Sequence, residues 1–170
     1  MKRWLIICSV IISNISFSQK QPYKVGEYAK YKISFGLLDV GYGELNISKL
    51  VLTKKTPTYH ITGIGKTSKF FDIFFKVRDI YETYIDTNTL LPVKFLRDVY
   101  EGGHIINQKY EFNHEKNLVY TQKKQYKIPN DSQDMLSAFF YARTFKKEKV
   151  LSDSVFNIPI FMDDENYFLE

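Results

Sequence analysis

Residues 77–100 read VRDIYETYIDTNTLLPVKFLRDVY, and this stretch decides the fold. Apolar and polar side chains alternate on both sides of the turn-forming residues 86–89, which is the pattern of two antiparallel strands joined by a hairpin. The register that we predict places Asp79 opposite Arg97 and Tyr81 opposite Phe95, because a slip by one residue brings like charges together.

The predicted hairpin carries an ion pair on its apolar side. Asp79 and Arg97 share one face with Tyr81 and Phe95, because side chains two residues apart in a strand point the same way. A charged pair on that face must be satisfied by hydrogen bonds. We therefore expect the Asp79–Arg97 pair to be either a structural brace or part of a binding site.

The same alternation extends from Val25 through most of the chain. Turn residues interrupt it about every 10 residues, which is typical of an antiparallel meander. In the first predicted hairpin Tyr31 lies opposite Ile47, and a third strand is predicted at residues 58–64. Most of the chain is therefore expected to be β-structure.

Two segments have helical spacing instead. Phe70, Phe71, Phe74 and Phe75 recur at the intervals of one helix face, with Ser68 available as an N-cap. A second short helix is predicted with Asp131 as its N-cap, Asp134 near its positive end, and an apolar stripe of Met135, Leu136, Phe139 and Phe140. The predicted fold is mainly β, a curved antiparallel meander or open half-barrel with two short helices packed on or across it.

The N-terminus has the three parts of a signal peptide in residues 1–18. The basic start Met1-Lys2-Arg3 precedes an apolar run at residues 4–12, and small residues follow at Ser16 and Ser18. The run is shorter than the ~20 residues that span a bilayer. We expect export to the bacterial periplasm or outer envelope, leaving residues 19–170 as a single β-rich domain without a transmembrane span.

Export restricts the chemistry of the mature chain. Cys8 is the only cysteine and is removed with the leader, so disulfides and thiolate sites are not expected. Loss of Lys2 and Arg3 lowers the net charge from +5 to +3. The remaining lysines are scattered, so nucleic acid is not an expected partner.

No catalytic, metal or cofactor motif stands out. Residues 63–67 end like a phosphate-binding loop, but His60 stands where the first glycine is required. The three histidines lack zinc-site spacing, and residues 163–165 lack the spaced ligands of a calcium loop. The sequence predicts no cofactor and favours a non-enzymatic role, although carboxylate pairs for glycan cleavage depend on the fold.

The aromatic content suggests a ligand instead. Phe, Tyr and Trp make up 16% of the chain, and many alternate toward one face of the predicted curved sheet. Such a sheet either packs these rings as a core or holds an apolar molecule. In the second case Arg97 turns from Asp79 to an anionic head group, and the candidate ligand-binding residues are Asp79, Arg97, Tyr81, Phe95, Phe70, Phe71 and Phe74.

Several motifs, spaced over most of the mature chain, resemble one family. They are Gly26-Glu27 with Tyr31, Gly36 and Gly41, then Val77-Arg78-Asp79 with Tyr81 and Asp86, Leu91-Pro92, Glu101-Gly102-Gly103, and Gln133-Asp134-Met135-Leu136-Ser137. Together they resemble the domain of unknown function 3108 family. The resemblance implies an exported bacterial envelope protein with a curved antiparallel sheet, and it supplies no catalytic residues.

Three functions remain open from the sequence. The first is a binding or carrier module for an apolar or lipid-like molecule. The second is a structural or interaction protein of the envelope, which uses an open sheet edge to bind a protein partner. The third is an envelope glycan hydrolase. The resemblance implies further strands beyond the alternating residues 166–170, so the domain is expected to be incomplete at its C-terminus.

Overall fold

The computed structural model describes residues 22–145, 147–151 and 155–169. The predicted signal peptide, residues 1–18, lies outside the described residues. One antiparallel sheet contains eight strands in sequence order. They are β1 (Tyr28–Phe35), β2 (Leu38–Thr53), β3 (Thr56–Thr67), β4 (Val77–Asp86), β5 (Pro92–Glu101), β6 (His104–Asn113), β7 (Leu118–Tyr120) and β8 (Gln125–Lys127).

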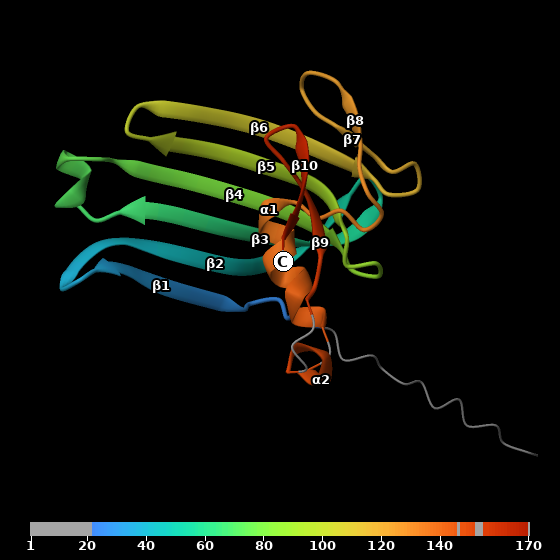
Figure 1. Ribbon diagram of the computed structural model, residues 1–170, viewed down its shortest axis with the longest axis horizontal. Helices are drawn as coiled ribbons and strands as arrows, with labels where there is room; N and C mark the ends of the chain where they lie inside the picture. Colours follow the sequence, from blue (N-terminus) through green and yellow to red (C-terminus); the bar gives the residue numbers. More distant parts are fainter. Residues whose placement is uncertain (1–21, 146, 152–154, 170) are drawn as a thin grey trace, which may run out of the picture.

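The other elements are short. A second sheet consists of β9 (Ile158–Met162) and β10 (Glu165–Leu169), and the helical elements are η1 (Phe71–Ile73), α1 (Met135–Tyr141), η2 (Ala142–Thr144) and α2 (Lys147–Val150). Figure 1 shows the long strands as one curved, open sheet, with α1 and the β9–β10 hairpin crossing one face. We call this the inner face. The predicted mainly-β meander with short helices across it is confirmed.

The two predicted helices differ from expectation in detail. The phenylalanine-rich segment forms only the single 3₁₀ turn η1; no residue of η1 is buried, so it lacks the packing that stabilises a longer helix. Ser68 does not cap it, and the Ser68 hydroxyl donates to the Asp39 carbonyl instead. The second helix is α1, but its N-cap is Asp134, whereas Asp131 precedes it in a left-handed turn conformation.

The β4–β5 hairpin forms as predicted, but its register is wrong by two residues. Tyr81 lies opposite Arg97, and Asp79 lies opposite Val99. The loop extends to Leu91, whose carbonyl accepts from the Asp86 amide. Pro92 has no N–H for the ladder, and the pairing becomes irregular beside it. A shift of two residues keeps every side chain on its predicted face.

The β1–β2 register also differs from expectation. Phe35 lies opposite Leu38, so the turn at Gly36 and Leu37 is tighter than the predicted loop. Gly36 has φ +59°, a left-handed conformation that glycine adopts without strain. Tyr31 consequently lies opposite Gly43 rather than Ile47.

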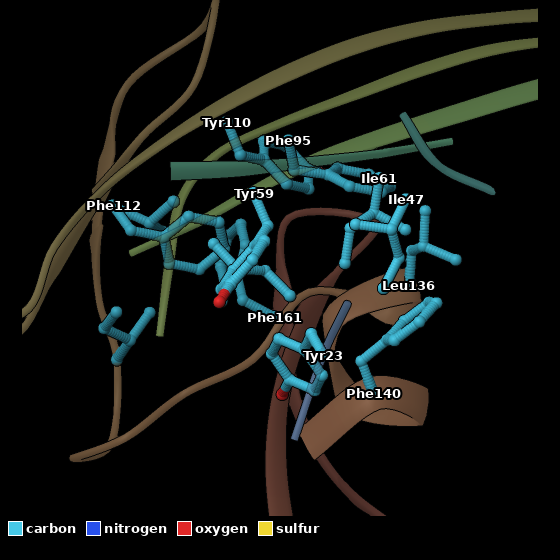
Figure 2. Packing of buried hydrophobic residues seen from close by; sticks show 13 residues of the cluster. Tyr23, Ile47, Tyr59, Ile61, Phe95, Tyr110, Phe112, Leu136, Phe140 and Phe161 are labelled. Carbon is cyan, nitrogen blue, oxygen red and sulfur yellow. The ribbon is translucent and has the colours of Figure 1, made fainter. Parts of the chain in front are cut away.

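The core lies between the inner face and the chain that crosses it. Leu136 and Phe140 of α1 and Phe161 of β9 pack against strand residues such as Ile47 and Ile61 (Figure 2). Phe161 is fully buried, with its ring centroid 5.1 Å from that of Tyr110. The core therefore occupies only the part of the inner face that α1 and β9 cover.

The opposite, outer face is solvated and carries ion pairs between neighbouring strands. Glu44 lies 3.3 Å from Lys30 and 3.4 Å from Lys66, and His60 Nε2 lies 2.6 Å from Glu82. This division between faces is why the period-two pattern is clear in the sequence.

Candidate ligand-binding site

Cross-strand pairing aligns the inner face of β2 to β6 into rows of side chains. One row runs across five strands as Ile47, Ile61, Thr83, Phe95 and Tyr110. All five are almost fully buried, because α1 and β9 lie over them. This row is core and offers no surface to a ligand.

In the next two rows β3 has glycine where the first row has Ile61, and in the farther of the two rows β2 also has glycine. The second row is Leu45, Gly63, Tyr81, Arg97 and Gln108, and the third is Gly43, Gly65, Asp79, Val99 and Ile106. Glycine inside a strand removes bulk from the sheet surface. The inner face of β2 and β3 is therefore hollow beside α1.

A groove of about 280 Å³ occupies this hollow. It lies over Gly43, Gly63 and Gly65, and the side chains around it include Tyr31, Leu45, Tyr81, Met135 and Leu136. Nearly all of the lining surface is apolar. The groove therefore suits an apolar group more than a polar one.

Two of the glycines play different structural roles. A Cβ on Gly63 would lie 3.3 Å from Leu136 Cδ1 and 3.4 Å from Leu45 Cδ2, so glycine is what allows α1 to pack closely on β3. A Cβ on Gly43 would meet only the Cβ of Tyr31, at 3.8 Å. Gly43 thus borders open space in the groove.

A second pocket, of about 200 Å³, shares Tyr31 and Leu45 with the groove and continues toward the C-terminal end of α1. Phe139 and Phe140 line it with apolar surface, and Arg143 lines it with a charge. The two pockets are therefore adjacent, and the second, which is more polar than the groove, contains the Arg143 cation.

Arg143 is fixed in position by several contacts. Its Nη2 lies 2.8 Å from Glu27 Oε2 and donates to the Pro22 carbonyl at 3.0 Å. The guanidinium also lies 5.7 Å from the ring centroid of Tyr23. The ion pair with Glu27 is partly exposed on both sides, so an anion from solvent can compete with Glu27 for Arg143.

The predicted ion pair between Asp79 and Arg97 does not form. Arg97 Nη1 lies 2.8 Å from Asp163 Oδ1, in the turn between β9 and β10, and donates to Gln108 at 3.4 Å. The changed register explains this result, since Arg97 lies opposite Tyr81 and stacks 5.8 Å above its ring centroid. Arg97 links the β9–β10 turn to the sheet.

Asp79 is left as a buried carboxyl group. Its Oδ1 atom is enclosed and has no hydrogen-bond partner among the described residues. Burial and the nearby Glu101 carboxylate raise the pKa of Asp79. Burial raises the pKa because a protonated carboxyl group costs less to bury than a carboxylate.

The structure brings together only part of the predicted ligand-binding set. Tyr81 lines the groove, and Asp79 and Arg97 are its neighbours on the inner face. Phe95 belongs to the buried core row. The other three predicted residues lie in or beside η1 at one end of the sheet and contact one another: Phe70, Phe71 and Phe74 (Figure 1).

Sequence reasoning missed the glycines and Arg143. A glycine inside a strand can signal the close approach of another element, and three such glycines lie inside β2 and β3: Gly43, Gly63 and Gly65. No sequence pattern singles out Arg143, because its position in the pocket depends on where α1 ends.

The remaining motifs do not form chemical sites. Residues 63–67, which end like a phosphate-binding loop, lie inside β3 and so cannot form the required backbone nest. Within residues 22–145, 147–151 and 155–169, no three His, Cys, Asp or Glu side chains are grouped to hold a metal ion. No helix in those ranges is long and apolar enough to cross a membrane.

Comparison with known proteins identifies the family of the chain. A family model described as "Protein of unknown function (DUF3108)" matches residues 30–170. No curated protein and no solved structure matches. The match covers most of the chain, which therefore belongs to this family, as the motifs in its sequence indicated.

Proposed function

We propose that this member of the DUF3108 family binds a small amphipathic molecule, with its apolar part in the groove beside α1 and its anionic head at Arg143. The observation that carries the proposal is the apolar groove over Gly43, Gly63 and Gly65. It is open beside a core that is otherwise closely packed.

The size of the site supports a small ligand. The groove of about 280 Å³ adjoins the pocket of about 200 Å³ through Tyr31 and Leu45. Small-molecule sites in proteins occupy about 300–1,000 Å³ and are lined mainly by apolar side chains. The two pockets together fall in that range and suit one flexible apolar chain.

The charge at one end supports an anionic head. A carboxylate or phosphate can form a two-point hydrogen-bonded pair with a guanidinium group. Both arginines are paired with a carboxylate, but Arg143 is better placed for this role, because its side chain is 38% exposed whereas that of Arg97 is 12% exposed. The ligand carboxylate would replace Glu27 at Arg143.

Binding of cis-parinaric acid, a fluorescent fatty acid, tests the proposal. Saturable binding of one molecule per chain is expected, and Gly43→Leu should abolish it by filling the groove, because the new side chain starts in open space. Asn107→Leu on the outer face is the matched control and should bind normally. The proposal fails if the wild type shows no saturable binding or if the two variants bind alike.

A second measurement tests the head-group position. Arg143→Gln should weaken binding of the fatty acid by about tenfold, because a charge-assisted hydrogen bond is worth about 1.5–3 kcal/mol. Binding of the corresponding fatty alcohol should change little. Equal losses of affinity for the fatty acid and the fatty alcohol would mean that the head group does not bind at Arg143.

The other two functions have less support. The outer edge of β1 carries Lys30 and Lys32, and its pairing with β2 is irregular after Ile33. Both features are typical of edges protected against pairing with another strand. For glycan hydrolysis, the acids among the residues that line the two pockets are Glu27 and Glu44; the Glu44 side chain is on the outer face, and both acids are already engaged in ion pairs.

A further inference from the structure

Exposed apolar side chains gather at one end of the sheet, at the β1–β2 turn and the β3–β4 connection. We call this surface the apolar tip, and it comprises Phe35, Leu37, Leu38, Phe70, Ile73 and Phe74. Each is more than half exposed, and Leu37 is completely exposed. Figure 1 shows both connections at the same end of the long strands, away from α2.

The apolar tip is a preorganised surface. The Ser68 amide donates to the Val40 carbonyl at 2.9 Å, and the Ser68 hydroxyl donates to the Asp39 carbonyl at 3.0 Å. These bonds join the β3–β4 connection to the start of β2. The Gly102 amide donates to the Lys76 carbonyl at 2.9 Å, which attaches the β5–β6 turn to the same structure.

The charges beside the apolar tip favour an anionic partner. Asp39 lies 3.0 Å from Lys32, and Asp72 is paired with Arg78, so both acids are neutralised. Lys69 and Lys76 are exposed, and neither forms an ion pair with another described residue, although Lys76 Nζ lies 5.8 Å from the ring centroid of Tyr100. The β3–β4 connection therefore adds two exposed positive charges, without an acidic partner in the described part of the chain, to the apolar tip.

We propose that the apolar tip docks on the surface of an anionic lipid bilayer. Aromatic and aliphatic side chains that project from turns can enter the boundary between head groups and acyl chains. Basic residues nearby add attraction to anionic lipids, worth about 1 kcal/mol for each lysine. A protein partner would need a pocket that accepts these two turns, whereas a bilayer surface accepts them without a matched shape.

This inference extends the proposed function but does not depend on it. The groove lies beside α1, and the apolar tip lies at the ends of the same strands. A chain that docks in this way would hold its groove close to a membrane. A change in the groove should leave docking intact, and a change in the apolar tip should leave the groove intact.

Vesicle flotation of the expected mature chain, residues 19–170, tests the proposal, because the basic and apolar residues 1–18 would bind vesicles by themselves. The wild type should float with vesicles of three parts phosphatidylcholine to one part phosphatidylglycerol, and bind less to phosphatidylcholine alone. The double variant Leu37→Asp/Phe74→Asp should lose at least about tenfold in bound fraction, because both changes remove apolar area from the contact. Leu52→Asp is the matched control, since Leu52 is also highly exposed but lies at the opposite end of β2.

Removal of single positive charges and folding controls complete the test. Lys69→Gln and Lys76→Gln should each weaken binding to the anionic vesicles about fivefold, with little effect on neutral vesicles. Circular dichroism checks that each variant is folded. If the double variant does not fold, the two lysine variants still test the proposal. Gly43→Leu should float like the wild type, which separates docking from ligand binding in the groove.

Three results would overturn the proposal. The wild type could fail to float with anionic vesicles, or the double variant could float as well as Leu52→Asp. A third contradictory result is a concentration-dependent dimer that the double variant abolishes, without vesicle binding by the wild type. That result would assign the apolar tip to a protein interface.

Discussion

The hydroxyl of Thr83 donates a 2.6 Å hydrogen bond to Oδ2 of Asp134, and both side chains are fully buried. Asp134 is also the N-cap of α1, where its other oxygen accepts from the amides of Leu136 and Ser137. One carboxyl group thus begins the helix and attaches it to β4. Because α1 forms one side of the groove, this contact sets the width of the proposed binding site.

Removal of the Thr83 hydroxyl should therefore destabilise the fold. Thr83→Val keeps the shape of the side chain but leaves Asp134 Oδ2 without its donor, which should lower the free energy of unfolding by about 1–3 kcal/mol. Thr62→Val, on the outer face of β3, should change it by no more than about 0.5 kcal/mol. Urea denaturation measures both, and equal values would show that the buried contact contributes nothing.

The stability of the protein should also depend on the ionisation of Asp134. Burial raises the pKa of Asp134 from its ordinary value to about 6, against the opposing effect of the hydrogen bonds from Thr83, Ser137 and Leu136. In the unfolded chain the carboxyl group titrates near about pH 4. As the pH rises from about 4 to 6, the unfolded chain releases this proton first, so the stability that the folded state gained by keeping it is lost.

The comparison with Asp134→Asn isolates this effect, because all other titrating groups are shared. The free energy of unfolding of the wild type minus that of Asp134→Asn should fall by up to about 3 kcal/mol between pH 4 and pH 7. Urea denaturation at several pH values gives this difference. A difference that stays constant, or that rises with pH, would contradict the assignment of a raised pKa to Asp134.

The contact between Arg97 and Asp163 should be worth more than an exposed ion pair. The Arg97 side chain is only 12% exposed, so loss of its partner leaves a charge nearly buried. Asp163→Asn should lower the free energy of unfolding by about 1–3 kcal/mol. Asparagine tolerates the left-handed φ of 51° at this position, so the backbone is not a further source of strain. Asp39→Asn, which breaks the exposed pair with Lys32, should cost at most about 1 kcal/mol. Thermal and urea unfolding compare the two variants. A larger loss of stability for Asp39→Asn than for Asp163→Asn would contradict the prediction.

The two groove glycines should respond in opposite ways to alanine. Gly63→Ala places a Cβ 3.3 Å from Leu136 Cδ1, so the buried Leu136 side chain must move by a few tenths of an ångström, which should lower the free energy of unfolding by about 1–3 kcal/mol. Gly43→Ala meets only ordinary contact with Tyr31 and should be neutral or stabilising by up to about 1 kcal/mol, because alanine loses less backbone entropy on folding. Similar losses of stability for both variants would contradict the close packing of α1 on Gly63.

The sheet was predictable because one of its faces is buried and the other is solvated, which gives a period-two pattern along every long strand. Face assignments were therefore correct even where the register was wrong, and Asp79, Tyr81 and Arg97 do share the inner face. The register itself depends on turn geometry. The extra loop residues before Pro92 and the tight turn at Gly36 have no counterpart in the apolar pattern.

The candidate site was harder to predict than the sheet. Aromatic residues suggested an apolar interior, but Phe95 is core and Phe70 is at the apolar tip, because spacing alone does not show which rings the crossing helix covers. The groove arises from missing side chains at Gly43 and Gly63 and from the position of α1. That position is set by the contact between Thr83 and Asp134, which are 51 residues apart in sequence.

Photocrosslinking gives the most direct test of the central claim, that an amphipathic ligand lies in the groove beside α1. A fatty acid with a diazirine near the end of its chain would be bound, irradiated and located by peptide mass spectrometry. Crosslinks are expected on residues that line the groove, Leu45, Tyr81, Met135 and Leu136, and they should disappear in Gly43→Leu. Crosslinks confined to the outer face or to the apolar tip, unchanged in Gly43→Leu, would contradict the account.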